Sequence, residues 1–434
     1  MLISFGVSNF LSFNEKTTFS MESGRATKKE SHLLPLESNA KPLLKFAAMF
    51  GKNGAGKTNF VRSIAVLQSF VVKGTLPRNA PNMWCKVQDE NETLPTEFEI
   101  KFCVEKEIYI YKIAVTLATG LISEESLIHQ VGNRKTALFK KESQDADYSF
   151  HHSIKGTKGD IEVLSRSFDL SGKLFLFSIN HNTTGFYRAN PEALVLSKIF
   201  LWFKDTLEVI FPDQPIQETS LLRYDVCKDQ FAALLKDFDT GIEEIRLESV
   251  SKEKAFENLD LRTQQKLNLE MNMLLPFIEI PAKLANQNLL EQQNLYSSVI
   301  RNRRNIFIIT YEKDMQFHYY ALKFVHKIGQ KEIEFNMESE SDGTHRLFQL
   351  LEILVSQKEK VYVFDEISRS LHPKLTVQFV KKYFSSIIGR NIQLITTTHE
   401  SRLLSHDLVR RDEIWICDEH DDQSTNLYSL EDKQ

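Results

Sequence analysis

Residues 51–58 read Gly51-Lys52-Asn53-Gly54-Ala55-Gly56-Lys57-Thr58, which fits the pattern G-x-x-x-x-G-K-[ST] of a phosphate-binding loop. An apolar run at 46–50 precedes the loop, and apolar side chains recur at helical spacing over 60–67. A strand, a glycine-rich loop and a helix are the context in which this motif binds phosphate. The sequence therefore predicts a nucleotide site here.

Each residue type in this loop suits a phosphate chain. Glycines let backbone N–H groups approach phosphate oxygens without Cβ clashes, and the helix start adds its positive dipole end. Lys57 is expected to reach the β- and γ-phosphates, and Thr58 to ligate Mg²⁺. The predicted ATP-binding residues of this segment are Gly51, Asn53, Gly54, Ala55, Gly56, Lys57, Thr58 and Asn59.

The bulk composition narrows the class of protein. The chain has 434 residues and a net charge of −4, so overall charge does not favour nucleic-acid binding, although a local basic patch remains possible. Its four cysteines, at 85, 103, 227 and 417, are too scattered for a zinc cluster or a disulfide framework. We find neither a signal-peptide pattern nor an apolar run of the ~20 residues needed to span a bilayer. We therefore expect a cytoplasmic protein with no membrane partner.

A second pair of candidate residues lies far along the chain. Residues 361–364 are an apolar strand pattern that ends in Asp365 and Glu366, as in a Walker B strand. Asp365 is expected to hold Mg²⁺, and Glu366 to polarise the water that attacks the γ-phosphate. The apolar strand pattern at 392–398 ends at His399, which suits a switch histidine bonded to the γ-phosphate.

Between these motifs the chain changes character. Residues 97–118 predict a hairpin, 191–211 and 228–238 predict helices, and 251–300 are polar and helix-prone. Strand patterns cover 242–250, 305–311, 319–326 and 333–337. We predict an N-terminal half of an ATPase head at 1–70 and a β-rich part of the head or insertion at 71–190. A mostly helical insertion lobe follows at 191–304, and the C-terminal half of the head at 305–434.

One further segment has two interpretations. Ser341, Gly343 and Thr344 precede an amphipathic helix. A small, hydroxyl-bearing turn at a helix start can cradle an anion, but Ser341 is also a common helix N-cap. Its position ahead of Asp365 makes it look like an ABC signature.

The order of these motifs resembles the ABC-class ATPase head. More narrowly, Phe364-Asp365-Glu366-Ile367, Leu371-His372-Pro373, Thr397-Thr398-His399 and the opening 7–13 look like the OLD-like and abortive-infection ATPases of prokaryotic phage defence. The resemblance covers 1 to about 70 and about 335 to 417. It implies an α/β fold: an ABC-type P-loop head with a mixed sheet, plus an inserted strand-and-helix lobe.

The same resemblance implies function and partners. It implies ATP and Mg²⁺ as ligands, and a homodimer or higher homo-oligomer through the ATP heads. Catalysis would rest on Lys57, Glu366 and His399, with Ser341 and Gly343 contacting nucleotide. In that group the ATPase usually works with a separately encoded effector, often a nuclease, and responds to phage infection. DNA or a phage-derived molecule is the trigger that we consider for this chain.

Departures from the pattern leave alternatives open. Gln68 and Gln88 are only candidates for a Q-loop glutamine, Ser368 stands where relatives often carry an acid, and no Toprim-like nuclease region follows His399. A RecF- or SMC-like DNA-repair ATPase remains open, as does a nucleotide-gated scaffold with slow turnover. DNA binding would require several basic clusters to converge on one surface. The candidate clusters are at 134–135, 140–141, 301–304 and 410–411.

Overall fold

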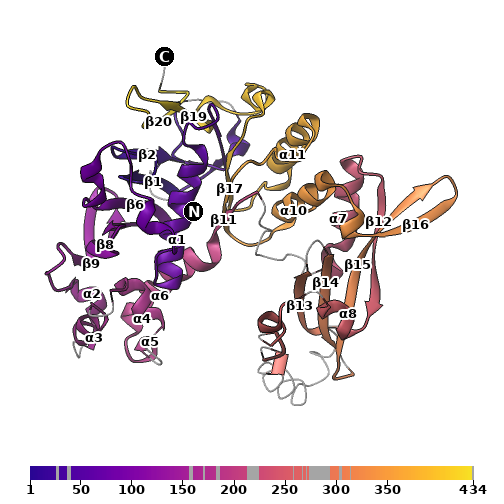
Figure 1. Cartoon of the computed structure of the whole chain (residues 1–434), viewed down its shortest axis with the longest axis horizontal. Coiled ribbons are helices and arrows are strands. Elements are labelled where there is room, and N and C mark those ends of the chain that lie inside the picture. Colours follow the sequence, from indigo (N-terminus) through magenta and orange to yellow (C-terminus); the bar gives the residue numbers. More distant parts are fainter. Residues whose placement is uncertain are drawn as a thin grey trace. The chain divides into compact units, whose positions relative to one another are not determined.

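The computed structural model describes residues 1–25, 29–36, 41–155, 160–169, 172–181, 186–212, 224–257, 259–265, 267–269, 271–272, 294–302, 305–312 and 314–432. The chain divides into two compact units (Figure 1). The head unit comprises Met1–Gln214, Gln357–Arg369 and Ile387–Gln434. The inserted unit comprises Pro215–Ser356 and Ser370–Ser386.

A six-stranded sheet in the head unit brings the distant motifs together. Its order is β11 (Leu207–Ile210), β17 (Lys360–Phe364), β18 (Ile392–Thr397), β5 (Phe46–Phe50), β19 (Ile414–Glu419) and β20 (Thr425–Ser429). All neighbours run parallel except β19 and β20, so the sheet is mixed. Strands β5, β17 and β18 are buried along their whole length, which explains why they read as continuous apolar runs.

A seven-stranded antiparallel sheet forms the other layer of the head unit. Its order is β10 (Ser149–Phe150), β9 (Arg134–Lys141), β8 (Leu121–Val131), β7 (Glu107–Thr116), β6 (Thr96–Val104), β1 (Leu2–Ser8) and β2 (Thr17–Ser20). The predicted hairpin is confirmed as β6 and β7. Its two turn residues, Glu105 and Lys106, both have positive φ (49° and 73°), as a two-residue hairpin turn requires.

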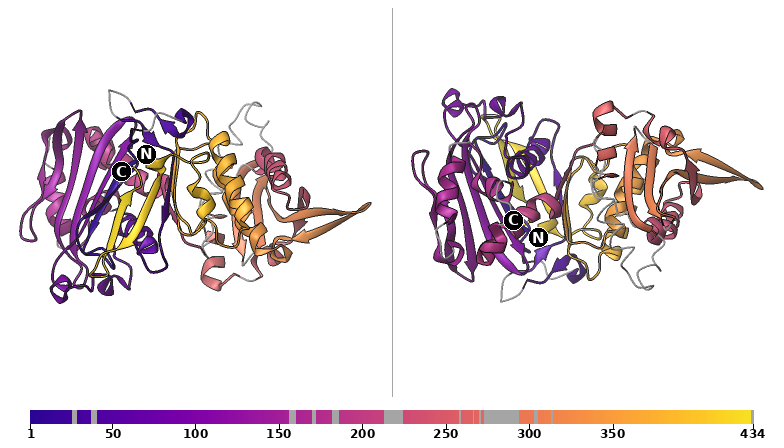
Figure 2. Two further views of the ribbon diagram at one scale, coloured as in Figure 1. Left: turned by 90° about the horizontal axis from the view of Figure 1, so that it is seen from above. Right: turned by 90° about the horizontal axis from the view of Figure 1, so that it is seen from below.

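The helix after the phosphate-binding loop packs against this second sheet. Helix α1 (Lys57–Lys73) begins after Gly56 and ends at Gly74, whose φ of 69° suits a left-handed C-cap. Its Phe60 ring makes edge contacts with Phe5 and Phe19, at centroid distances of 5.7 and 5.2 Å. One hydrophobic core contains side chains of α1 and of both sheets. Strands from the two ends of the chain also lie side by side there, β2 next to β20 (Figure 2).

Short helices complete the head unit: α2 (His152–Lys155), α3 (Asp160–Asp169), α4 (Phe175–His181), α5 (Phe186–Ala189) and α6 (Leu194–Leu201). A fully buried carboxylate, Glu125 on β8, holds the start of α4. It accepts hydrogen bonds from the backbone N–H groups of Phe175 (2.7 Å) and Leu176 (3.1 Å), and from the hydroxyls of Tyr111 (2.7 Å) and Tyr148 (2.5 Å). Burial raises the pKa of Glu125, although its four donors oppose that effect.

The inserted unit has a sheet of its own, in the order β12 (Ile242–Val250), β15 (Phe317–Ile328), β14 (Asn305–Glu312) and β13 (Asn294–Asn302), with β16 (Lys331–Asn336) also paired to β15. The predicted strands near 242–250, 305–311, 319–326 and 333–337 are confirmed. Helices α7 (Tyr224–Asp237), α8 (Lys252–Phe256), α10 (Asp342–Val355) and α11 (Pro373–Ser386) accompany the sheet. Phe348 of α10 packs on Phe231 and Phe324, at centroid distances of 5.2 and 5.7 Å.

Two stretches differ from the expected helices. The helix predicted over 191–211 ends at Leu201, passes through a π-helical turn at Trp202–Thr206 and becomes strand β11. Pairing with β17 decides this, because a four-residue apolar run fits a helix or a strand equally well. Of the helix-prone 251–300, residues 294–300 belong to β13, whereas 273–293 lie outside the described residues. The α/β class, the mixed sheet and the inserted strand-and-helix lobe are as predicted.

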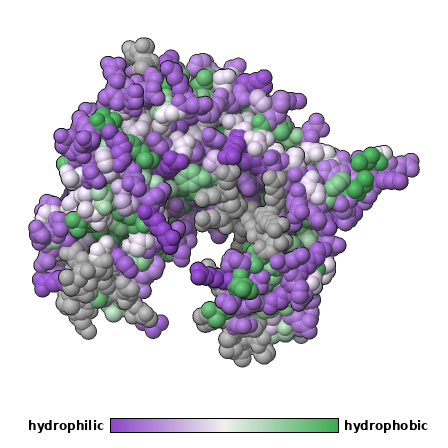
Figure 3. Space-filling view, in the orientation of Figure 1, coloured by the Kyte–Doolittle hydropathy of each residue, from purple (hydrophilic) through white to green (hydrophobic). Residues whose placement is uncertain are grey.

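The inserted unit exposes apolar side chains on its β15–β16 hairpin (Figure 3). Ile328 is 62% exposed and Ile333 is 37% exposed. In the part of the chain that the structure describes, no helix has both the length and the apolar content to cross a bilayer.

Candidate nucleotide site

The phosphate-binding loop wraps around its own lysine. The Nζ atom of Lys57 donates to the carbonyls of Gly51 (2.7 Å) and Lys52 (2.8 Å), and the residue is only 6% exposed. Burial lowers the pKa of Lys57, although the nearby Asp365 and Glu366 carboxylates favour its charged form. The ammonium therefore lies in the concavity of the loop, where an anion would gain most from it.

Close packing requires glycine at two positions of the phosphate-binding loop. A Cβ on Gly51 would lie 2.3 Å from the carbonyl oxygen of Cys417 on β19. At Gly56, which has a φ of 99°, a Cβ would lie 2.0 Å from Oγ1 of Thr425. The loop is therefore pressed against the β19–β20 pair, and its shape depends on both glycines.

Oxygen ligands suited to Mg²⁺ meet at the ends of β5 and β17. The Thr58 hydroxyl lies 3.2 Å from Oδ1 of Asp365, and the Thr397 hydroxyl donates to the same oxygen at 2.7 Å. Asp365 is 2% exposed. Mg²⁺ prefers oxygen ligands and is usually bound by one or two carboxylates together with substrate phosphates, so the Thr58–Asp365 pair fits such an ion. The described residues contain no group of three or more His, Cys, Asp or Glu side chains placed for another metal.

The carboxylate next to Asp365 adopts a strained backbone conformation. Glu366 has a φ of 52°, which costs a non-glycine residue about 1–2 kcal/mol. Three hydrogen bonds hold it there: Glu366 N–H to the Thr397 hydroxyl (2.8 Å), Ile367 N–H to the Thr397 carbonyl (3.1 Å) and Arg369 N–H to the Glu366 carbonyl (3.1 Å). Strain that is retained beside a buried carboxylate is typical of a functional site.

His399 follows β18, the strand between β5 and β17. The Thr398 N–H donates to the Met49 carbonyl at 3.0 Å, so the segment before His399 is tied to the strand that leads into the phosphate-binding loop. The His399 side chain is exposed. The structure thus brings Lys57, Thr58, Asp365, Glu366 and the His399 segment to one edge of the six-stranded sheet.

The structure places the two candidates for a Q-loop glutamine in different surroundings. Gln68 donates to the carbonyls of Phe203 (2.9 Å) and Leu207 (2.5 Å), which ties α1 to the π-helical turn. Gln88 directly precedes a short 3-10 helix, Asp89–Glu92. The Ser368 hydroxyl lies 3.2 Å from that of Thr398.

The signature candidates lie in the inserted unit, at the start of α10. Ser341 is the N-cap: its Oγ accepts the Thr344 N–H at 3.1 Å. A Cβ on Gly343 would lie 3.0 Å from the Ser370 carbonyl, so this turn is tightly packed against the segment before α11. The capping interpretation of Ser341 is confirmed, and contact of Ser341 and Gly343 with nucleotide stays a prediction.

Sequence reasoning missed three hydroxyl residues. Thr397 orients both Asp365 and Glu366, while Ser12 and Thr425 line the phosphate-binding loop. The Thr397 position at the end of an apolar strand was a usable signal. Ser12 and Thr425 are separated by most of the chain, and no local pattern predicts their contact.

The basic clusters do not all offer exposed charge. Arg410 is buried and bonds both carboxylate oxygens of Asp412, at 2.9 and 2.7 Å. Lys141 is also buried, whereas Arg134 and Lys135 are exposed on β9. The side chains of the 301–304 cluster lie outside the described residues.

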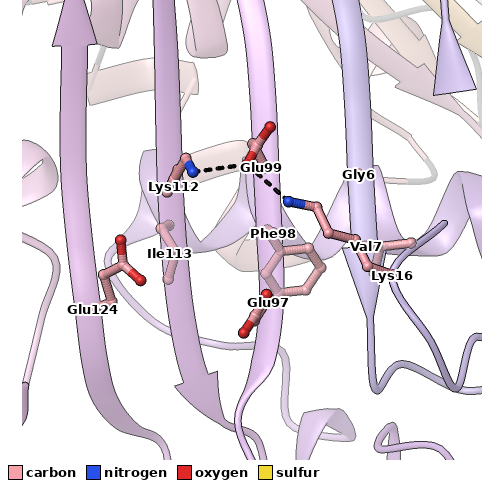
Figure 4. A pocket seen from close by; sticks show the side chains of 9 residues that line it. All are labelled: Gly6, Val7, Lys16, Glu97, Phe98, Glu99, Lys112, Ile113 and Glu124. Carbon is pink, nitrogen blue, oxygen red and sulfur yellow. Dashed lines mark hydrogen bonds and ion pairs between the residues drawn. The ribbon is translucent and has the colours of Figure 1, made fainter. Parts of the chain in front are cut away.

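A small hollow on the seven-stranded sheet of the head unit is lined by paired charges (Figure 4). Its Glu99 carboxylate bonds the ammonium groups of Lys16 (3.0 Å) and Lys112 (2.9 Å). Burial alone would raise the pKa of Glu99, but these two bonds outweigh burial and lower it. With a volume of only about 60 Å³, this hollow is a poor candidate for a nucleotide.

One family model matches part of the chain. Residues 230–405 match the family model described as "AAA domain, putative AbiEii toxin, Type IV TA system". The match includes the segments of Ser341, Asp365, Glu366 and His399 but not the phosphate-binding loop. The chain is thus similar to this AAA-domain family over 230–405, and its mixed α/β sheet, with strand β5 leading into the phosphate-binding loop, is the fold class that the motif order implied.

Several solved structures are similar across nearly the whole chain. An SMC head bound to the C-winged helix domain of ScpA has 14% identity and a TM-score of 0.42, covering 99% of this chain and 98% of its own. The SMC head domain from Thermotoga maritima has 9% identity and a TM-score of 0.33, with coverages of 99% and 98%. An SMC head with an extended coiled coil, bound to the C-terminal domain of ScpA derived from Pyrococcus furiosus, has 15% identity and a TM-score of 0.38, with coverages of 99% and 97%. No curated protein matches the chain.

Proposed function

We propose that this protein is a cytoplasmic, Mg²⁺-dependent ATPase that acts as the sensor, regulator or scaffold of an antiphage system of the abortive-infection type. It controls a separately encoded effector, which we infer to be a nuclease by analogy with the group it resembles. The observation that carries the ATPase part is the shared sheet edge, where the buried Lys57, the Thr58–Asp365 oxygen pair and the strained Glu366 meet. The AbiEii description of the matching family model supports the defence part.

In this proposal each residue of the site has a separate role in ATP hydrolysis. Lys57 and the loop N–H groups bind the β- and γ-phosphates. Thr58 and Asp365 supply oxygen ligands for Mg²⁺, which when bound neutralises charge on the phosphates. Glu366 accepts the proton of the attacking water, and His399 donates a hydrogen bond to the γ-phosphate. Thr397 positions both acids through its hydroxyl.

Assembly completes the site. In this proposal two copies meet head to head around ATP, and Ser341 and Gly343 of one subunit contact the γ-phosphate held by the partner's Lys57. The exposed N-cap of α10 supports this arrangement, because a 14-residue helix places a positive dipole end at its start.

The inserted unit is the proposed contact for the effector or for further oligomerisation. Exposed charges at the start of α8, at Lys252, Glu253 and Lys254, are the surface favoured by the sequence. The exposed apolar residues Ile328 and Ile333 of the β15–β16 hairpin are a second candidate surface, since apolar side chains exposed together often mark interaction sites.

Phage challenge tests the proposed function directly. Cells carrying the parent chain and its neighbouring genes are compared with cells carrying Lys57→Ala, and with the matched control Lys135→Ala, which changes an exposed lysine of β9. We expect the parent and the control to protect, and Lys57→Ala to lose protection. A neighbouring gene product should copurify with the parent during infection.

Two results would contradict the proposed function. Equal survival of cells with the parent and with Lys57→Ala would contradict a nucleotide-dependent defence role. Retarded DNA migration in the presence of the parent, together with unchanged phage survival, would instead favour the DNA-repair alternative.

A further inference from the structure

A hollow of about 520 Å³ opens beside the phosphate-binding loop, entirely within the head unit. Four segments form it: the loop after β1, the first turn of α1, residues 82–87 and the β19–β20 turn. The lining residues that matter here are Ser12, Asn59, Asn82, Trp84, Lys86 and Asp422.

The inner wall of this hollow is hydrogen-bonded to the phosphate-binding loop. Asn59, two residues after Lys57, donates to the Ser12 hydroxyl at 2.9 Å. The Thr425 hydroxyl lies 2.7 Å from that of Ser12 and 3.0 Å from the Ala55 carbonyl. Because Lys57 reaches the β- and γ-phosphates, the nucleoside end of a bound nucleotide must lead away from it. The hollow is lined by Asn59 and Ser12, which belong to this hydrogen-bonded wall.

The half-buried indole of Trp84 forms a flat wall of the hollow, on a backbone that is tied to the loop after β1. Backbone bonds hold its neighbours: the Met83 carbonyl accepts the Leu11 N–H at 2.7 Å, and the Cys85 N–H donates to Oδ1 of Asn9 at 3.1 Å. The Lys86 ammonium lies over the indole, 3.0 Å from the ring centroid. A planar, π-rich group can stack on an indole, and on the face that Lys86 covers it would displace the ammonium.

The Asp422 carboxylate, in the β19–β20 turn, lines another side of the hollow. The Asp422 Oδ1 accepts the Ser424 N–H at 2.9 Å, and the turn is closed by the Gln423 N–H to the His420 carbonyl at 2.9 Å. The hydrogen bonds from Ser424, its side chain first and then its backbone, lower the pKa of Asp422, so the side chain is an acceptor at neutral pH. An ionised carboxylate disfavours another anion and favours N–H donors.

We propose that this hollow binds the nucleobase, with Trp84 stacking on the ring and Asp422 accepting a hydrogen bond from the exocyclic amine of adenine. The inference rests on the proposed ATPase function and deepens it, because it names the residues that select the base. Adenine presents its N6 amine as a donor, which a carboxylate can accept. Trp84 supplies affinity for any base, and Asp422 supplies the preference for one that carries an amine.

Nucleotide titrations that follow tryptophan fluorescence test the proposal. The other two tryptophans, Trp202 and Trp415, are buried, so nucleotide should act on the signal of Trp84. The ligands are ATP, purine riboside triphosphate, which has hydrogen in place of the amine, and inorganic tripolyphosphate, which has no base. The variants are Trp84→Phe, Trp84→Ala, Asp422→Ala and the matched control Asp421→Ala, an exposed aspartate of the same turn. Calorimetry replaces fluorescence for the two Trp84 variants.

We expect the parent and Asp421→Ala to bind ATP about tenfold or more tighter than purine riboside triphosphate, and Asp422→Ala to bind the two equally. Trp84→Ala should weaken both nucleotides roughly tenfold, and Trp84→Phe should recover most of that loss. Tripolyphosphate should bind all five proteins alike, which also shows that they are folded.

Two outcomes would overturn the proposal, and they are distinguishable. If the parent binds ATP but Asp422→Ala keeps the preference, or Trp84→Ala binds ATP as the parent does, the base lies elsewhere and the ATPase proposal stands. If the parent binds neither ATP nor tripolyphosphate, the proposed ATPase function is wrong and the base site is wrong with it.

Discussion

Replacing Gly56 by alanine tests whether the shape of the phosphate-binding loop depends on its contact with the β19–β20 pair. Gly56 has a φ of 99°, and its new Cβ would lie 2.0 Å from Oγ1 of Thr425 and 2.8 Å from Oγ of Ser12. A left-handed backbone costs alanine about 1–2 kcal/mol, and overpacking a filled site adds about 1–3 kcal/mol. We therefore expect Gly56→Ala to lose about 2–5 kcal/mol of unfolding free energy and to lose ATP binding.

The matched control is Gly120→Ala, because Gly120 has a φ of 75° and nothing lies within 4 Å of its added Cβ. This variant should lose only the backbone part, about 1–2 kcal/mol, and should bind ATP normally. Urea denaturation measures the two losses, and calorimetry measures ATP binding.

A second-site change sharpens this test. Thr425→Ala removes the atom closest to the new Cβ, so the double variant with Gly56→Ala should recover part of the lost stability. Equal losses for Gly56→Ala and Gly120→Ala, or no recovery in the double variant, would refute the steric argument.

Three further outcomes follow from individual contacts. Thr397→Ala removes the 2.7 Å hydrogen bond to Asp365, so the activation free energy of ATP hydrolysis should rise by about 1–3 kcal/mol. The affinity for ATP, measured by calorimetry, should change less. Equal losses of hydrolysis and of affinity would contradict a positioning role for Thr397. Lys57→Ala and Ser341→Arg should each be inactive alone, yet their mixture should regain hydrolysis, because each mixed dimer contains one intact site; co-assembled dimers with no activity would count against the ATP sandwich. The pKa of Glu125 is raised in the folded protein, so Glu125 stabilises the protein below pH 4.5, and this contribution is lost as the pH rises toward the folded-state pKa. In urea denaturation the parent should therefore lose up to about 1.4 kcal/mol of unfolding free energy per pH unit relative to Glu125→Gln. Parallel pH profiles of the two proteins would contradict this.

The phosphate-binding loop and the Asp365–Glu366 pair were predictable because a short stretch of sequence contains the whole pattern of each. The loop 51–58 is recognisable by its glycine spacing and by the strand and helix patterns that flank it. In the structure this loop surrounds the Lys57 ammonium. The Asp365–Glu366 pair was predictable for a similar reason, since a buried parallel strand reads as an uninterrupted apolar run. Residue type and position along a strand determine these features.

Other parts depend on contacts that no short window contains. The strand β11 exists because it pairs with β17, and an apolar run of four residues does not specify that partner. Thr425 approaches Gly56 because β20 closes the far edge of the sheet, more than 360 positions later in the chain. The strained φ of Glu366 likewise follows from bonds to the end of β18.

The most direct test of the central claim compares ATP hydrolysis and ATP binding in the parent and in Glu366→Gln, with Mg²⁺ present. Glutamine keeps the size of the side chain but cannot accept the proton of the attacking water, while Lys57, Thr58 and Asp365 are untouched. We predict that the variant binds ATP with parental affinity and that its hydrolysis rate falls by two orders of magnitude or more. Hydrolysis by Glu366→Gln at the parental rate would contradict the account.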